Sequence, residues 1–230
     1  MIDMKNNQIT GTLFIVSAPS GTGKTSLVNA LVRDTNHLKL SISHTTRKPR
    51  PKEIDGYNYH FITEDKFKQM AMAGVFMESA NVFGNWYGTS QETVQKMLAE
   101  GHDVVLEIDW QGAEQIKKRF PDAISIFILP PSIQALQDRL ESRGQDSEEV
   151  IQTRMTKAIA ELKHYHKADF LVVNDVFEDA LKGLKAIIKA NRMSTAKQEV
   201  LNQELIQQLI DWFSVCGLLM LSSSYFLKWK

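Results

Sequence analysis

The sequence predicts an α/β fold with a central parallel sheet that is flanked by helices. Short apolar runs rich in β-favouring residues occupy residues 12–17, 104–108, 124–129 and 170–173, and helical segments lie between them. Strands that alternate with helices imply right-handed crossovers and a parallel sheet that is covered on both faces. The chain has 230 residues, 43% of them hydrophobic, which suffices for one large α/β domain with small insertions.

The expected helices follow the strands in order. After the first strand, a glycine-rich turn leads into an amphipathic segment at residues 25–33, which gives the pattern strand, loop, helix. A second helix is expected at residues 111–119, between the two middle strands, and a long one at residues 148–168, before the last strand. Helix and strand therefore alternate over most of the chain.

Two stretches interrupt this alternation. Residues 40–89 contain short alternating runs and a helix capped by Thr63, so a small, mostly β insertion is expected there. Residues 141–149, which read ESRGQDSEE, are polar and lie between helical segments, as in a mobile lid. The expected organisation is a domain over residues 11–192, with a core at 11–40 and 90–192, the insertion at about 41–89 and the lid at about 139–154.

Residues 193–230 form a C-terminal extension of uncertain structure. The segment LNQELIQQLIDWF at residues 201–213 has an amphipathic helical pattern. The apolar part, residues 212–221, is shorter than the ~18 to 20 residues of a membrane span. We therefore expect no integral membrane span, and we favour a self-packing or subunit-contact tail over an interfacial anchor. The subunit-contact alternative leaves a homo-oligomer open.

Charge and cysteine content exclude several classes of protein. Lys plus Arg equals Asp plus Glu, at 27 each, so no overall field favours nucleic acid, and an anionic ligand must be held by local clusters. The single cysteine, Cys216, cannot form an internal disulfide and is far in sequence from any histidine, so a disulfide framework and a zinc site are not indicated. The N-terminal stretch is polar, unlike a signal peptide, and a cytoplasmic location is expected.

A phosphate-binding loop is the clearest motif. Residues 18–25 read APSGTGKT and match G-x-x-x-x-G-K-[ST], with Ala18 at the first glycine position. A loop that opens a helix points backbone amides inward, and glycines let the backbone approach phosphate oxygens. In this motif the lysine reaches the β and γ phosphates, and the threonine hydroxyl coordinates Mg²⁺. The expected ATP-binding residues are Ala18, Pro19, Ser20, Gly21, Thr22, Gly23, Lys24 and Thr25.

A basic cluster follows the next strand. Residues 41–50 read SISHTTRKPR, in which Arg47 and Arg50 are three positions apart. Arginine suits planar, bidentate contact with phosphate oxygens, and two arginines near a phosphate loop would bring a donor and an acceptor phosphate together.

Over residues 11–192 the chain resembles the guanylate kinase family. Besides the phosphate loop, the matching blocks occur in the family's order. They are SHTTRKPR at 43–50, Gly56-x-x-Tyr59, FMESANVFGNWYGT at 76–89, EIDWQG at 107–112, ILPPS at 128–132, RLESRGQDSEE at 139–149 and VVND at 172–175. The resemblance implies a P-loop kinase that transfers the γ-phosphoryl group of ATP to GMP, in purine metabolism and GMP recycling.

The resemblance also assigns residues to roles. The GMP phosphate would be held by Arg47, Arg50, Tyr59 and Tyr87, and the guanine would be read by Ser43, Glu78 and Thr89. Glu107 and Asp109 match an acidic pair near Mg²⁺ and GMP, and Glu107 would join Thr25 in the metal shell. The catalytic cations would be Lys24 and the lid arginines Arg139, Arg143 and Arg154, while Asn174 would lie near the adenine.

The chemistry of Glu78 supports guanine independently of the resemblance. Guanine presents N1–H and a 2-amino group side by side, and a carboxylate accepts from both, whereas adenine offers an unprotonated N1 and no 2-amino group. The departures from the family are Ala18 for glycine, Glu107 where many members have Asp, and the extension after Arg192. The alternatives are another nucleoside monophosphate kinase or a non-catalytic binding module, which would not need Lys24 and Thr25.

Overall fold

The computed structural model describes residues 2–3, 8–9, 11–142 and 148–222. Their contacts form two compact units. The larger comprises residues 11–187 and the smaller combines residues 2–9 with the chain after residue 187, apart from the segments outside the described ranges. The expected division into core, insertion, lid and extension is not settled by these units and stays a proposal.

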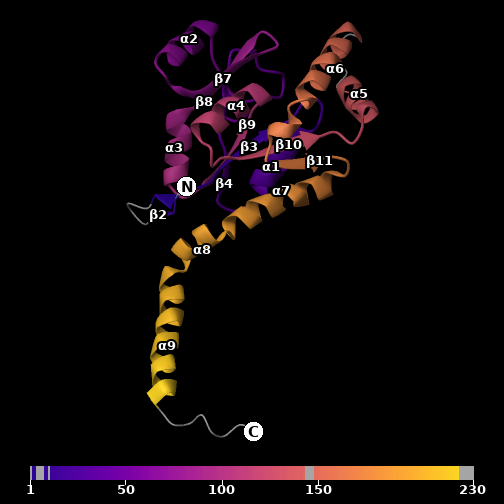
Figure 1. Ribbon diagram of the computed structural model, residues 1–230. Helices are drawn as coiled ribbons and strands as arrows, with labels where there is room; N and C mark the ends of the chain where they lie inside the picture. The colour runs from indigo at the N-terminus through magenta and orange to yellow at the C-terminus, as the bar shows by residue number, and fades with distance from the viewer. Residues whose placement is uncertain (1, 4–7, 10, 143–147, 223–230) are drawn as a thin grey trace. The chain divides into compact units, whose positions relative to one another are not determined.

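The larger unit is built on a five-stranded parallel sheet (Figure 1). The order across it is β11-β10-β3-β9-β4, and every neighbouring pair is parallel. The α/β fold with a central parallel sheet is therefore confirmed. The strands are β3 (Leu13–Ser17), β4 (Leu38–Leu40), β9 (Asp103–Glu107), β10 (Ile124–Leu129) and β11 (Phe170–Val173).

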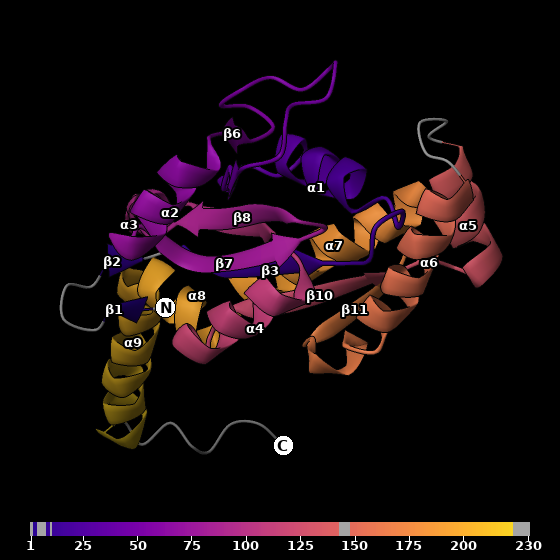
Figure 2. The ribbon, with the colours of Figure 1, turned by 90° about the horizontal axis from the view of Figure 1, so that it is seen from above.

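Helices connect and cover these strands, as the two views in Figures 1 and 2 show. They are α1 (Lys24–Arg33), α3 (Gln91–Ala99), α4 (Trp110–Arg119), α5 (Ile133–Glu141), α6 (Glu148–Leu162) and α7 (Phe177–Arg192). α6 ends six residues before the expected boundary, and a short 3-10 turn, Tyr165–Lys167, follows. The ring of His164 stacks on Trp110 with 3.7 Å between centroids, which anchors the chain where the helix stops.

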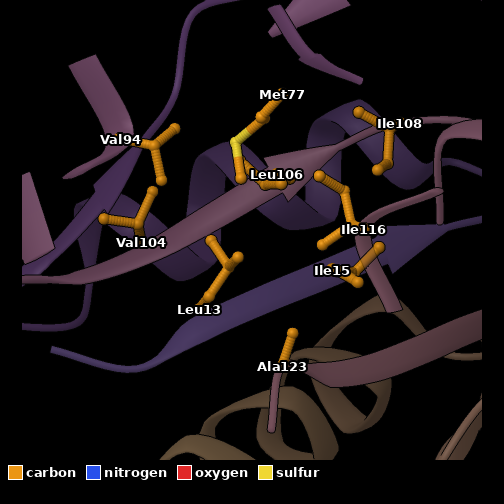
Figure 3. Packing of buried hydrophobic residues seen from close by; sticks show 9 residues of the cluster. All are labelled: Leu13, Ile15, Met77, Val94, Val104, Leu106, Ile108, Ile116 and Ala123. Atoms are coloured by element: carbon orange, nitrogen blue, oxygen red, sulfur yellow. The ribbon is translucent and has the colours of Figure 1, made fainter. Parts of the chain in front are cut away.

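One hydrophobic cluster packs the sheet against its neighbours (Figure 3). Leu13 and Ile15 of β3 lie with Leu106 of β9, all at most 7% exposed. Alternate residues of a strand point to the same face, so these side chains form one apolar layer. The rest of the cluster comes from β7, β9, α3, α4 and the adjoining loops: Met77, Val94, Val104, Ile108, Ile116 and Ala123. Burial of this layer stabilises the face of the parallel sheet that packs against β7, α3 and α4.

A second, mixed sheet lies within residues 44–90, so the mostly β character predicted for this stretch is confirmed. The strands run in the order β6-β5-β8-β7, with β5 and β6 parallel and the other pairs antiparallel. Their bounds are β5 (His44–Thr45), β6 (His60–Phe61), β7 (Phe76–Val82) and β8 (Asn85–Ser90). Helix α2 (Glu64–Met72) begins after Thr63, whose hydroxyl accepts a hydrogen bond from the Lys66 amide.

The smaller unit contains a strand pair and two helices. β1 (Ile2–Asp3) and β2 (Gln8–Ile9) are antiparallel, and α8 (Thr195–Leu201) contacts β2. α9 (Gln203–Ser222) extends beyond the amphipathic segment expected at residues 201–213. Within the described residues, no helix has the length and apolar character needed to cross a membrane.

Candidate active site

A cavity of about 440 Å³ lies where the phosphate loop, the end of β9 and the mixed sheet meet in the larger unit. Its wall contains most of the site residues expected from the sequence. These are Ala18, Pro19, Ser20, Gly21, Gly23, Lys24, Thr25, Ser43, Arg47, Arg50, Tyr59, Glu78, Tyr87, Glu107, Asp109 and Arg154. Segments that are far apart in the chain therefore form one site.

The phosphate loop joins β3 to α1 at the carboxyl edge of the parallel sheet. Gly23 precedes the helix with φ of +87°, and a Cβ there would lie 2.6 Å from Nδ2 of Asn174, so both conformation and space require glycine. Nζ of Lys24 donates to the carbonyl of Ile108, 2.9 Å away. The loop lysine is thus held at the end of β9, beside the space where phosphates would bind.

Two acidic residues lie where β9 ends, Glu107 as its last residue and Asp109 just after it, and they differ in their contacts. The Thr25 hydroxyl donates to Oε1 of Glu107 at 2.5 Å, which places a hydroxyl and a carboxylate side by side next to the loop. Asp109 lines the cavity and also caps α4, because its Oδ1 accepts from the Gly112 amide at 2.9 Å. Among the described residues, no group of three or more His, Cys, Asp or Glu side chains is arranged to hold a metal.

Glu78 is a buried carboxylate, 4% exposed, on β7. The Thr89 hydroxyl donates to its Oε1 at 2.5 Å, and Oγ of Ser43 lies 3.5 Å from that hydroxyl. Burial raises the pKa of Glu78 to about 7; the negative charge of Asp109 adds to this, and the hydrogen bonds of Thr89 oppose it.

Local backbone geometry places Glu78 at this position. The pairing of β7 with β8 shifts between Phe76 and Glu78, so β7 carries one extra residue, Met77, at a bulge. Met77 packs into the sheet's hydrophobic cluster, and the following Glu78 meets Thr89. The other carboxylate oxygen of Glu78, Oε2, lies close to Gly112 of α4, where an added Cβ would be 2.6 Å from it.

In the loop that follows β5, Arg47 and Arg50 both lie close to the carboxylate of Glu53. Nη2 of Arg47 lies 2.8 Å from Oε1 of Glu53, and Nη1 of Arg50 lies 3.7 Å from the same atom. Burial acts to raise the pKa of Glu53, but the hydrogen bonds from Arg47 and from the Arg50 amide outweigh it, so that the pKa is lowered. The Arg47 guanidinium also lies over Tyr59, whose ring meets that of Tyr87 edge-on, with centroids 5.9 Å apart.

Helix α6, whose first residues overlap the segment predicted as a lid, contacts the phosphate loop through two side chains. Nη2 of Arg154 donates to Oγ of Ser20 at 2.8 Å, and the half-buried Glu161 accepts from the Ser20 amide. Burial raises the pKa of Glu161 to about 7, with the charge of Lys24 opposing the rise and that of Asp109 adding to it. Arg154 and Glu161 therefore both bind α6 to Ser20 of the phosphate loop.

Four of the expected residues support the loop or Glu78 and do not line the cavity: Thr22, Thr89, Arg139 and Asn174. Nδ2 of Asn174 donates to the Thr22 carbonyl at 2.6 Å, and Arg139 donates to the Asn174 carbonyl at 3.0 Å. Arg143 lies outside the residues that the structure describes.

Sequence reasoning missed several residues at the site, and three of them contact or closely approach expected site residues. Glu53, which holds both arginines, is six positions after Arg47, and only its closeness to the basic cluster could have drawn attention to it. Glu161 is one of several polar residues late in a helix, and Gly112 is a helical glycine within a matched block. Nothing in their spacing indicates that they meet Ser20 and Glu78.

Comparisons with known proteins agree with one another. A family model described as guanylate kinase matches residues 10–191. A guanylate kinase of Pseudomonas fluorescens (strain Pf0-1) is 55% identical over 201 residues, which cover 87% of this chain and 98% of the relative. One from Methylobacillus flagellatus is 54% identical and covers 87% and 99%, respectively. The crystal structure of guanylate kinase from Anaplasma phagocytophilum has a TM-score of 0.71 at 28% identity and covers 86% of this chain and 97% of its own.

The fold and the cavity define the class of this protein first. A phosphate loop after the first strand of a parallel sheet, which shares one cavity with side chains of a small mixed sheet, is the arrangement of a P-loop nucleoside monophosphate kinase. The comparisons then identify the particular family. The chain belongs to the guanylate kinase family and is a phosphotransferase. Neither alternative raised by the sequence is favoured by these comparisons.

Proposed function

We propose that the protein transfers the γ-phosphoryl group of ATP to GMP, giving ADP and GDP, within the cavity described above. The observation that carries this proposal is the buried Glu78 carboxylate in the same cavity as Lys24. A carboxylate in a buried pocket pairs with the adjacent N1–H and 2-amino donors of guanine, and it repels the bare N1 of adenine. The loop lysine marks the phosphate donor side.

On the donor side, the chain supplies amides, a lysine and two oxygen ligands. The loop amides and Lys24 bind the ATP phosphates, and Asn174, which fixes the loop through Thr22, lies toward the adenine. Mg²⁺ prefers oxygen ligands and keeps water and phosphate in its shell, so the adjacent Thr25 hydroxyl and Glu107 carboxylate fit it. When bound, this ion neutralises charge on the ATP phosphates.

On the acceptor side, Arg47 and Arg50 bind the GMP phosphate. In the structure both are held by Glu53, which keeps their guanidinium groups together before a phosphate replaces part of that contact. The hydroxyls of Tyr59 and Tyr87 donate to the same phosphate, and Ser43 and Thr89 complete the guanine pocket around Glu78.

Catalysis in this proposal comes from position and charge. The chain holds the two nucleotides in line and needs no nucleophilic side chain of its own. Lys24 and the lid arginines Arg139, Arg143 and Arg154 stabilise negative charge on the transferring group. Closure of the lid and the insertion excludes water, which would otherwise accept the phosphoryl group. The proposed location is the cytoplasm, where the nucleotides are found and Cys216 would stay reduced.

Replacement of Lys24 by Met tests the donor side. We expect a fall in kcat of about a hundred-fold or more, because one charge–phosphate contact is lost in the transition state. Lys96→Gln, which changes an exposed lysine of α3, is the matched control and should keep wild-type turnover. Both proteins should unfold at the wild-type temperature. Near wild-type GDP formation by a folded Lys24→Met protein would refute this mechanism.

A further inference from the structure

The turn between β7 and β8 has an unfavourable residue at its first position. Val82 pairs with Asn85, so Phe83 and Gly84 form a two-residue loop, and both have positive φ, at 52° and 76°. Turns of this kind favour Asn, Asp or Gly at both positions, because other side chains are strained there. Phe83 in this conformation is therefore strained, and we look for a contact that offsets the strain.

Lys157 of helix α6 supplies a contact to the Phe83 ring. Nζ of Lys157 on α6 lies 4.2 Å from the centroid of the Phe83 ring, within the range of a cation–π interaction. Phe83 lines the active-site cavity and is 44% exposed, so the ring stands at the cavity's edge. Arg154 and Glu161, which contact the phosphate loop, lie on the same helix as Lys157. One helix thus touches the donor side of the cavity and the tip of the mixed sheet.

We propose that Phe83 and Lys157 form a positioning contact that couples the binding of the two nucleotides. The inference rests on the proposed function, in which the lid, which includes the first residues of α6, and the insertion with the mixed sheet close over the two nucleotides. A ligand that fixes either side favours the contact, and the contact in turn favours the other ligand, so the coupling is positive and reciprocal. An exposed cation–π pair supplies a factor of about two to five in affinity, or roughly 0.5 to 1 kcal/mol.

The charges around Lys157 decide which variants are informative. Lys157 also acts electrostatically on Glu161, which faces Lys24 and Asp109. A change of charge at position 157 therefore alters the donor side as well as the contact. Phe83→Leu removes only the aromatic ring and keeps an apolar side chain of similar reach, so it isolates the contact. Lys157→Arg and Phe83→Tyr keep a cation and a ring, respectively.

The test measures coupling by titration calorimetry in the presence of Mg²⁺. The Kd of a non-hydrolysable ATP analogue is determined with and without saturating GMP, and the ratio of the two values is the coupling factor. We expect GMP to tighten analogue binding to the wild type, and Phe83→Leu and Lys157→Gln each to reduce the ratio about two- to five-fold. The double variant should lose no more than either single one, and Lys157→Arg, Phe83→Tyr and the Lys96→Gln control should keep the wild-type ratio.

A second variant tests the strain at the turn. Phe83→Asn places a favoured residue at the positive φ, so we expect a higher midpoint of thermal unfolding, by roughly 2 °C, together with reduced coupling. An unchanged coupling factor in Phe83→Leu, or no coupling in the wild type, would overturn the inference. GDP formation by the wild type separates the two claims: if GDP forms and the coupling result is negative, only the positioning contact fails.

Discussion

At the scale of single residues, the site depends on a carboxylate that the fold keeps from water. Glu78 is buried beside Asp109 and accepts a hydrogen bond from Thr89. A buried carboxylate is costly unless donors surround it, and two guanine donors would supply what Thr89 alone does not. Glu78 is therefore a destabilising group that a guanine ligand would satisfy.

The pH dependence of stability tests the burial of Glu78. Because the folded-state pKa is raised from 4.5 to about 7, the stability linked to its proton is fully present below pH 4.5 and lost as pH rises through 7. Gln carries no such titration. We expect Glu78→Gln to gain stability over the wild type between pH 5 and pH 8, by on the order of 1 to 3 kcal/mol.

Urea unfolding at pH 5, 6.5 and 8 measures this difference. The exposed Glu199→Gln is a control that also removes one carboxylate, and its difference from the wild type should not grow over that range. A Glu78→Gln advantage that is constant or shrinks as pH rises would show that the carboxylate is not destabilised by burial.

Gly112 provides a second residue-scale test, because it limits the space behind Glu78. A Cβ at Gly112 would displace Oε2 of Glu78, the far end of a flexible side chain, while Ala favours the helix by about 0.5 to 1 kcal/mol. We expect Gly112→Ala to keep or raise the unfolding temperature and to raise the KM for GMP about ten-fold, with the KM for ATP unchanged.

Steady-state kinetics and thermal unfolding of Gly112→Ala should be compared with Gly183→Ala. Gly183 is also helical, but a Cβ there meets only Val172 at 3.9 Å, so that variant should keep both KM values. An unchanged KM for GMP in Gly112→Ala would mean that the position of Glu78 does not govern acceptor binding.

At the scale of elements, sequence patterns predicted those features that depend on neighbouring residues. The phosphate loop followed from a motif between a strand and a helix, and the cap at Thr63 from residue type. The bulge at Met77 did not, because it depends on how β7 pairs with β8. The prediction that this helix ends at residue 168 was wrong, because α6 ends at Leu162. The stacking of His164 on Trp110, which anchors the chain there, joins segments that are distant in sequence.

The C-terminal elements carry a prediction of their own. Every described residue that lines the cavity precedes Lys163, and the family model ends at residue 191. We therefore expect truncation after Ser194, which removes α8 and α9, to leave kcat/KM per folded chain within about two-fold of the full-length value. Circular dichroism and active-site titration of both lengths establish the folded fraction. A large loss of kcat/KM in a folded, truncated protein would place part of the catalytic unit in the tail.

At the scale of the whole molecule, the fold class and the family followed from the sequence, whereas the internal contacts of the site did not. Alternating elements predicted the parallel sheet, and ordered motif blocks predicted the family. The pairing of Ser20 with Glu161 arises only when separate segments meet, and the pairing of Arg47 with Glu53 depends on how the loop that carries both residues folds.

The central claim is that this cavity accepts GMP because Glu78 reads the guanine. The measurement that tests it most directly is the ratio of kcat/KM for GMP to that for AMP at saturating Mg-ATP, in the wild type and in Glu78→Gln. The wild type should strongly favour GMP, and the ratio should fall roughly ten- to a hundred-fold in the variant, because one guanine donor loses its acceptor. A wild type that prefers AMP, or a ratio unchanged in Glu78→Gln, would contradict the account.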